Sequence, residues 1–227
     1  MSGPGIGAKG RAELMEPRQR RNVECCHPQP SGETGKPAAG TSYRPIALWL
    51  TGLPGAGKST IGRALDQRFR AASVASYLLD ADEVRARLNS DLGFSAEDRT
   101  ENLRRAAEVT RMMVDAGLIV VAAFISPLQV DRQRVRQIVG YGTFVEVFVD
   151  TSLEECERRD PKGMYGKARA NLMHNFTGIS APYEPPTQPD VHIRTELVSI
   201  GEAVTLICGH LERVAGLPDK GDATAAE

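Results

Sequence analysis

Blocks of apolar and polar residues along this chain predict a regular order of strands and helices. Short apolar runs, typical of buried parallel strands, occur at 46–51, 74–79, 118–124, 144–150 and 191–194. Between and after them, the spacing of apolar residues predicts helices at 58–70, 83–89, 98–116, 128–139, 153–159 and 200–215. Strands that alternate with helices in this way predict an α/β fold, in which a parallel sheet is flanked by helices on both faces.

Residues 1–45 lack this pattern. They hold 7 Gly and 6 Pro but only three of Ile, Leu, Val and Phe, namely Ile6, Leu14 and Val23. A segment so poor in large apolar groups cannot offset its ordering entropy, so we expect a largely disordered leader over 1–45. The folded domain is then predicted at 46–217, followed by a short tail over 218–227.

The composition narrows the class of protein. The chain has 227 residues with 28 Lys+Arg and 29 Asp+Glu, hence a net charge of −1, which gives no reason to expect nucleic acid or a membrane as a partner. No apolar run reaches the length of about 18 residues that a spanning helix needs, and the first 30 residues contain no apolar signal core. The four cysteines have no metal-ligand spacing. A cytoplasmic protein is expected.

Polar residues collect where three of the predicted strands end. Gly52–Ser59 follows the first strand, Asp80–Arg85 the second and Ser126 the third. In an open parallel sheet ligands bind outside the carboxyl ends of the strands. We therefore expect these segments to form one site.

The first of these segments is a phosphate-binding loop. Residues Gly52–Ser59 read GLPGAGKS and match the GxxxxGK[ST] pattern, between a predicted strand and a predicted helix. Glycines allow backbone amides to point at phosphates, Lys58 would reach the β- and γ-phosphates, and Ser59 would hold Mg²⁺. The alternative is a glycine-rich turn with a surface lysine. The residues expected to bind ATP are Gly52, Gly55, Ala56, Gly57, Lys58, Ser59 and Thr60.

A second region predicts a mobile lid. The segment 160–189 is rich in Gly and Pro and is expected to be irregular, and 158–169 is basic. Its cationic residues are Arg158, Arg159, Lys162, Lys167 and Arg169. A lid that closes positive charge over phosphates would exclude water and stabilise the transferring group, whereas the alternative is a solvated loop. The predicted fold is thus a phosphate-loop NTPase type with a lid segment.

The carboxylates after the second strand suggest a kinase. A carboxylate can orient an acceptor hydroxyl or take its proton, and we assign this role to Asp82; the alternative is that Asp80 or Asp82 only caps the next helix. Arg99 and Asn102 lie three residues apart, so they share a helix face that suits an anionic substrate. Arg85, Arg104 and Arg105 add positive charge nearby. The alternative is a solvated helix face paired with Glu97, Asp98 and Glu101.

At this point the chain resembles the adenylylsulfate (APS) kinases, which are phosphate-loop small-molecule kinases. The similar blocks are GLPGAGKST at 52–60, DADEVR at 80–85, LGFSAEDRTENLRR at 92–105, FISP at 124–127, RDPKGMYGKAR at 159–169 and FTGISAPYE at 176–184. These blocks span nearly all of 46–215 in order. The family usually has Asp-Gly-Asp-Asn where this chain has Ala81 and Glu83.

The resemblance implies a role for each matching residue. Phe94 and Phe176 would stack on the adenine of APS, while Asp82 would orient its 3′-hydroxyl. The other expected substrate-binding residues are Arg85, Arg99, Asn102, Ile125, Ser126, Lys162 and Thr177. Lys58, Asp82 and Ser126 are the expected catalytic residues. Ser126 matches the position treated in the family as a possible phosphoserine intermediate, but we favour direct in-line transfer with Ser126 hydrogen-bonded to substrate.

The leading hypothesis is therefore a kinase of sulfate activation that uses MgATP to phosphorylate the 3′-hydroxyl of APS, forming 3′-phosphoadenylylsulfate (PAPS). The alternatives are a related kinase with another small hydroxyl acceptor, and a non-catalytic nucleotide-binding partner protein. The resemblance further implies a homodimer and an ATP sulfurylase on a separate chain.

Overall fold

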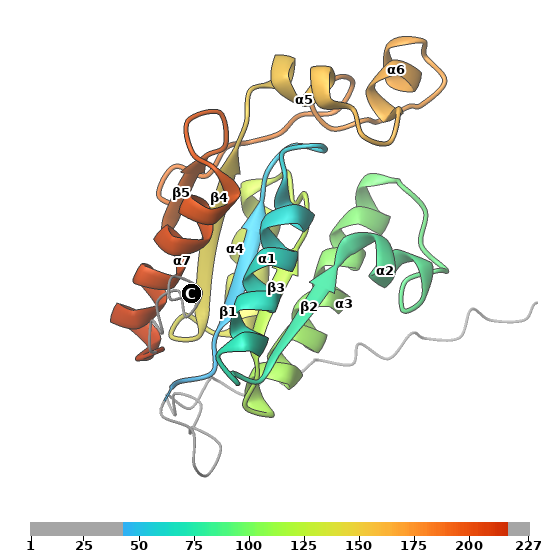
Figure 1. Ribbon diagram of the computed structural model, residues 1–227. Coiled ribbons are helices and arrows are strands. Elements are labelled where there is room, and N and C mark those ends of the chain that lie inside the picture. The colour runs from blue at the N-terminus through green and yellow to red at the C-terminus, as the bar shows by residue number, and fades with distance from the viewer. Residues whose placement is uncertain (1–42, 218–227) are drawn as a thin grey trace, which may run out of the picture. The chain divides into compact units, whose positions relative to one another are not determined.

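The computed structural model describes residues 43–217, and its centre is a five-stranded sheet. The strands are β1 (Ala47–Thr51), β2 (Ser76–Asp80), β3 (Ile119–Ala123), β4 (Phe144–Asp150) and β5 (Val191–Arg194). They follow the order β2-β3-β1-β4-β5, and every neighbouring pair is parallel. The predicted parallel sheet is confirmed, and its carboxyl ends all lie at one edge (Figure 1).

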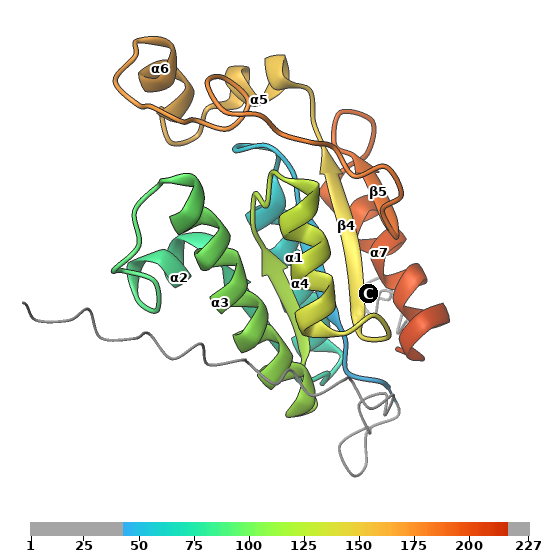
Figure 2. The same ribbon diagram turned by 180° about the vertical axis from the view of Figure 1, so that it is seen from behind.

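Helices cover both faces of this sheet, as predicted. The helices are α1 (Lys58–Ala71), α2 (Ala81–Ala86), α3 (Ala96–Asp115), α4 (Gln129–Val139), α5 (Leu153–Arg159), α6 (Met164–Arg169) and α7 (Ile200–Ala215). Helices α1 and α7 pack on one face, and α3 and α4 pack on the other (Figures 1 and 2). Helices α5 and α6 lie beyond the carboxyl ends of the strands, where a lid belongs (Figure 1).

Strand β1 divides the core into two apolar clusters. Its alternate side chains point to opposite faces, so Leu48 and Leu50 join the cluster under α1 and α7, whereas Ala47 and Trp49 join the cluster under α3 and α4. All five residues of β1 are buried, as are all five of β3. Burial on both faces explains why these strands read as continuous apolar runs in the sequence.

Most element boundaries agree with the prediction to within two residues, but one helix was missed. The segment 160–189 is not wholly irregular, because α6 forms at 164–169. Both carboxylate oxygens of Asp160 accept from the start of this helix: Oδ1 from the amide of Tyr165 and Oδ2 from that of Gly166, each over 3.1 Å. The contacts that begin this helix thus come from a residue outside it, which the spacing of apolar residues within 164–169 does not reveal.

The folded part also begins earlier than predicted. Tyr43 is buried, and the Arg44 amide donates to the carbonyl of Ala215 over 2.8 Å. The rest of the expected leader, 1–42, and the expected tail, 218–227, lie outside the described residues. Among the helices at 43–217, none has the length and apolar character needed to cross a membrane.

Candidate active site

The phosphate loop joins the carboxyl end of β1 to the first turn of α1. Gly55 and Gly57 adopt positive φ angles of 77° and 104°, a region that glycine enters without steric cost. Gly52, with φ 155°, lies against β4, and a Cβ atom there would stand 2.4 Å from the carbonyl oxygen of Val149. The loop therefore needs glycine at Gly52 for space and at Gly57 for conformation.

Lys58 points back into this loop. Its Nζ donates to the carbonyls of Gly52 (2.9 Å) and Leu53 (2.7 Å), and the residue is 8% exposed. Burial lowers the pKa of Lys58 to about 8, while the charges of Asp80 and Asp82 act in the opposite direction. The carboxylates that follow β2 therefore lie within electrostatic reach of the phosphate loop, as the sequence predicted.

Two hydroxyl groups from other segments donate hydrogen bonds to the phosphate loop. Thr151 Oγ1, just after β4, donates to the carbonyl of Ala56 over 3.0 Å, and Tyr165 on α6 donates to the carbonyl of Pro54 over 2.9 Å. Burial raises the pKa of Tyr165, so its phenol stays protonated and remains a donor. The lid segment is thus attached directly to the phosphate loop.

A cavity of about 580 Å³ opens beside the loop. Its walls come from the phosphate loop, the start of the lid and the connection between β5 and α7; they include Gly55, Gly57, Thr60, Arg159, Pro161, Thr195, Val198 and Ile200. This volume lies within the usual range for small-molecule sites. The β5–α7 connection was not predicted to take part, although it follows the carboxyl end of a strand, a signal that could have found it.

The structure distinguishes two carboxylates that the sequence left as alternative helix caps: Asp80, the last residue of β2, and Asp82 in α2. Asp80 caps α2, since its Oδ1 accepts from the amide of Asp82 over 3.0 Å. The Asp82 side chain is 69% exposed and forms an ion pair with Lys162 of the lid. The helix is thus capped by Asp80, and the Asp82 side chain points to the lid instead.

The remaining charges of the lid are mostly paired within it. Arg158 and Arg159 both bond to Glu155, and Arg169 pairs with Glu157. Lys162 is the lid cation that reaches across to α2. Of the five cations in the lid prediction, the structure brings Lys162 to the carboxylate, and Arg159 lines the cavity beside the loop.

A cluster of two arginines and a phenylalanine lies near the end of α2; its members are Arg85, Arg99 and Phe94. The Arg85 guanidinium lies over the Phe94 ring, 4.6 Å from its centroid, and donates to the Gly93 carbonyl over 2.9 Å. Arg99 Nε donates to the Phe94 carbonyl over 3.1 Å. Burial, and then the charge of Arg99, lowers the pKa of Arg85. Two guanidinium groups this close favour an anion between them.

Arg104 and Arg105 bond to carboxylates outside this cluster. Both bond to Glu101, and Arg105 adds a bidentate pair with Asp91 at 2.8 and 2.9 Å. These contacts hold the pKa of Glu101 at about 2. Arg104 and Arg105 thus form a paired helix face, in which Glu101 is the one partner among the three acids predicted. Arg99 instead bonds to Phe94, Thr177 and Asn175.

Three other residues that were predicted to bind the acceptor substrate are buried. Asn102 is 4% exposed, and its Oδ1 accepts from Asn89 Nδ2 over 3.0 Å. Phe176, at 6%, packs its ring edge-to-face with Tyr165, and Thr177, at 1%, accepts from Arg99. No ring contact joins Phe176 to Phe94 among the described residues.

Ser126 differs most from its predicted role. The residue is 2% exposed, and its hydroxyl accepts from Trp49 and donates to Thr51. Both of these hydrogen bonds are made within the protein. Its neighbour Ile125 is partly exposed.

The sequence profile of the family described as adenylylsulphate kinase matches residues 44–194, which contain the phosphate loop, the carboxylates and the lid. The chain belongs to the adenylylsulphate kinase family.

Relatives within this family are highly similar. The adenylyl-sulfate kinase of Klebsiella pneumoniae (strain 342) is 56% identical over 154 residues, which cover 68% of this chain and 77% of that protein. The bifunctional enzyme NodQ of Rhizobium tropici is 55% identical over 154 residues, again 68% of this chain but only 24% of NodQ. The chain thus spans about a quarter of that relative.

A solved adenylylsulphate kinase also shares the fold. The APS kinase CysC of Mycobacterium tuberculosis, determined in complex with AMPPNP and APS, superposes with a TM-score of 0.72 at 42% identity, covering 74% of this chain and 98% of that one. The described part of this chain is therefore a phosphate-loop kinase fold.

Proposed function

We propose that this protein transfers the γ-phosphoryl group of ATP to the 3′-hydroxyl of APS, giving PAPS and ADP. The observation that carries the proposal is the ion pair between Asp82 and Lys162. This ion pair joins a carboxylate that could orient an acceptor hydroxyl to a cation of the lid. The charges of both residues also affect the pKa of Lys58 in the phosphate loop. The family and the identity to adenylyl-sulfate kinases support APS as the acceptor.

ATP fits on the phosphate-loop side. The amides of the loop from Gly52 to Thr60 and the Lys58 ammonium would hold the phosphates, and the N-terminal end of α1 adds a favourable dipole. The cavity lined by Arg159, Thr195 and Ile200 would take the base and ribose. Thr151 and Tyr165, which donate to carbonyls of this loop, would help to hold its shape.

The residues present also suit Mg²⁺. Magnesium prefers oxygen ligands and commonly binds through one or two protein groups together with substrate phosphates. Ser59 offers a hydroxyl at the start of α1, and Asp80 is a buried carboxylate whose Oδ2 has no hydrogen-bond partner within residues 43–217. Bound Mg²⁺ would supply charge neutralisation to the triphosphate.

APS fits on the other side of the phosphate loop. Arg85 and Arg99 would receive its phosphosulfate, and Phe94, which is 65% exposed, would stack on its adenine. The Ile125–Ser126 turn would meet the same substrate through its backbone, with Thr177, Phe176 and Asn102 shaping the walls. Asp82 would orient the 3′-hydroxyl and accept its proton while Lys162 neutralises charge on the transferring group.

This arrangement favours direct in-line transfer. Positioning and electrostatic stabilisation suffice for phosphoryl transfer, and the Ser126 hydroxyl is committed to Trp49 and Thr51. We further propose that the protein is a cytoplasmic homodimer supplied with APS by an ATP sulfurylase on a separate chain. Light scattering after gel filtration will test the dimer.

The decisive experiment measures ADP release with ATP plus APS, against ATP alone, together with chromatographic detection of PAPS. APS-dependent ADP release with matching PAPS supports the proposal. Turnover with a different hydroxyl acceptor in place of APS would instead favour a related kinase, and ATP binding without turnover on any acceptor would favour a non-catalytic partner protein.

A further inference from the structure

Four side chains and one backbone carbonyl form a hydrogen-bond network at the Ile125–Ser126 turn. Trp49 Nε1 lies 3.1 Å from Ser126 Oγ, and Ser126 Oγ lies 3.0 Å from Thr51 Oγ1. Thr51 Oγ1 in turn lies 2.7 Å from the Ile125 carbonyl and 3.0 Å from the Tyr183 hydroxyl. Tyr183 comes from the loop between α6 and β5, so the network connects β1, the turn after β3 and that loop.

The direction of every bond in this network follows from its two ends. An indole N–H can only donate, so Ser126 Oγ accepts from Trp49 and has its proton left to give. A carbonyl can only accept, so the single Thr51 proton goes to Ile125. Thr51 must then accept from both Ser126 and Tyr183. Burial raises the pKa of Tyr183 to about 12, which keeps its phenol protonated as this scheme requires.

The network holds an unfavourable backbone conformation. Ser126 has φ 38°, in the left-handed region that is costly for a residue with a side chain. The buried Arg132 on α4 supports the same turn by donating to the carbonyls of Ser126 (2.9 Å) and Pro127 (3.1 Å). Within residues 43–217 the amides of Ile125 and Ser126 donate to no protein acceptor. These two amides, in the turn that follows β3, are therefore donors that a ligand could use.

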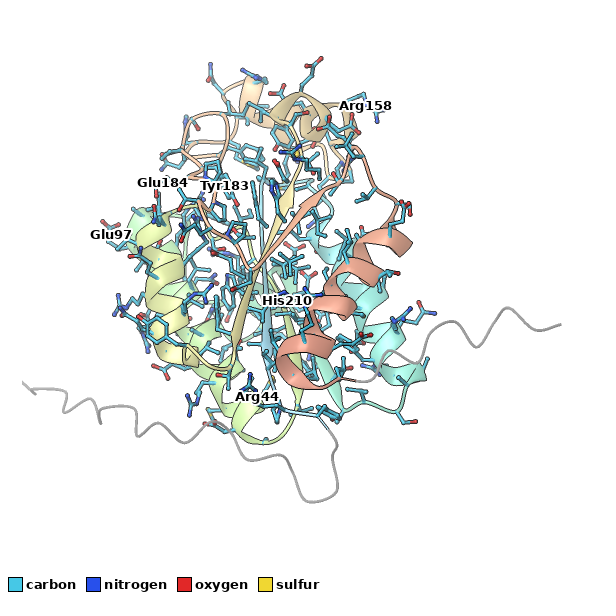
Figure 3. All side chains as sticks on the ribbon, turned by 90° about the vertical axis from the view of Figure 1, so that its left-hand side faces the viewer. Arg44, Glu97, Arg158, Tyr183, Glu184 and His210 are labelled. Atoms are coloured by element: carbon cyan, nitrogen blue, oxygen red, sulfur yellow. The ribbon has the colours of Figure 1, made fainter. Side chains whose placement is uncertain are left out.

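Glu184, the residue after Tyr183, holds the same loop against the turn. Its amide donates to the Pro127 carbonyl over 2.8 Å, and its carboxylate accepts from the amide of Gln129 over 2.7 Å. The N-cap of α4, Leu128, has no capping side chain, so Glu184 supplies the missing acceptor. Tyr183 and Glu184 lie together at this side of the molecule (Figure 3).

We propose that Tyr183 is a positioning residue for the acceptor: through Thr51 and Ser126 it holds the Ile125–Ser126 turn so that both backbone amides face the anionic part of the substrate. The inference rests on the proposed function for the identity of that substrate. It assigns a role to the Tyr-Glu end of the 176–184 block, which the sequence singled out without one.

The kinetic test removes one oxygen atom. Tyr183→Phe keeps the ring, which lies 6.2 Å from Phe148, but deletes the donor to Thr51. We expect the KM for APS to rise about three- to tenfold, the loss expected from one neutral hydrogen bond, with the KM for ATP unchanged. Unchanged KM values, or equal changes in both, would overturn the positioning role.

The chain offers a matched control. Tyr43 is also buried, and its hydroxyl accepts from the amide of Ala75 over 3.1 Å. Its chain neighbour Arg44 lies at the opposite end of the molecule from Tyr183 (Figure 3). Tyr43→Phe should therefore lower the melting temperature as Tyr183→Phe does, without raising the KM for APS. A rise in both variants would show that the effect is only structural.

A spectroscopic test is independent of turnover. Trp49 is the only tryptophan of the chain, so its indole N–H gives a single nitrogen–proton NMR resonance. We expect Ser126→Ala and Tyr183→Phe to move this resonance, and Tyr43→Phe to leave it in place. A resonance that Tyr183→Phe does not move would overturn the network, whereas a wild-type protein with no APS turnover would overturn the proposed function and leave this test intact.

Discussion

The Arg99 guanidinium donates to Thr177 Oγ1 over 3.0 Å and so joins α3 to a loop 78 residues further along the chain. The same side chain donates to the carbonyls of Phe94 and Asn175. One arginine thereby sets the separation of the two segments that form the proposed acceptor pocket.

Replacing Arg99 should therefore weaken acceptor binding selectively. Arg99→Lys keeps the charge but loses the planar fork that bonds in three directions, so lysine cannot hold Phe94 and Thr177 together. We expect the KM for APS to rise at least about tenfold, because hydrogen bonds to charged groups contribute about 1.5–3 kcal/mol. Steady-state kinetics with each substrate varied in turn will measure this.

The control for this variant lies on the same helix. Arg104 is paired with Glu101 and Glu108, so Arg104→Lys should change the KM for APS by less than about twofold, as for an ordinary surface pair. Equal effects of the two substitutions would contradict the role of Arg99.

Asp82 should determine the rate of phosphoryl transfer and should not affect the binding of ATP. Asp82→Asn keeps the size of the side chain but removes the proton acceptor, and general-base groups commonly contribute about 10²- to 10⁴-fold to kcat. We expect a loss in that range, while the Kd of a non-hydrolysable ATP analogue, measured by calorimetry, stays within about twofold of wild type.

The neighbouring residue Glu83 provides the comparison for Asp82. It is exposed and lies in the first turn of α2, so Glu83→Gln alters the local charge equally. If Glu83→Gln lowered kcat as much as Asp82→Asn, the effect would be one of general charge, and the assignment of Asp82 would fail.

The fold was predictable because burial leaves a direct trace in the sequence. Strands β1 and β3 are covered on both faces, so their apolar runs are unbroken, and the glycines of the phosphate loop mark the turn between β1 and α1. Helix α6 left no such trace, since the contacts that begin it come from Asp160, outside the helix.

The site was predictable only in part, because spacing cannot say what a side chain bonds to. Arg99 and Arg105 are close in sequence, but Arg99 bonds to Thr177 and Arg105 to Asp91. Ser126 looked reactive at the end of a strand, but its hydroxyl is enclosed by Trp49 and Thr51. Thr177 lies 78 residues from Arg99, and Trp49 lies 77 residues from Ser126, so a single sequence does not reveal these pairs.

Gly52 should be the glycine of the phosphate loop least tolerant of a side chain. In Gly52→Ala the new methyl would stand 2.4 Å from the Val149 carbonyl oxygen, so β1 and β4 would have to separate. We expect a loss of about 2–4 kcal/mol in the free energy of unfolding, together with weaker ATP binding. Thermal and urea unfolding will measure the first effect.

A second glycine serves as the comparison for Gly52. Gly201, in α7, has no positive φ, and a methyl group added to it would meet no described atom within 4 Å, so Gly201→Ala should stabilise the protein by about 0.4–1 kcal/mol. Losses of similar size in both variants would mean that steric contact with β4 is not the cause.

The buried Lys58 should make ATP binding depend on pH above neutrality. Burial lowers its pKa from 10.5 to about 8, so the free protein loses this charge as the pH rises through 8, whereas bound phosphates would hold the proton in place. ATP affinity should then be full below pH 8 and decline up to about tenfold per pH unit above it.

The same lowered pKa fixes the sign of the effect of Lys58 on stability. Between pH 8 and 10.5 the unfolded chain binds more protons at this lysine than the folded chain does, so the cost of burying the charge is present below pH 8 and disappears as the pH rises.

The prediction for ATP binding is tested by calorimetric titration with an ATP analogue from about pH 6.5 to 9.5. Lys58→Arg, measured alongside, separates the titration of Lys58 from that of other groups, because arginine keeps its charge throughout. A wild-type affinity as flat with pH as that of the arginine variant would rule out the titration of Lys58.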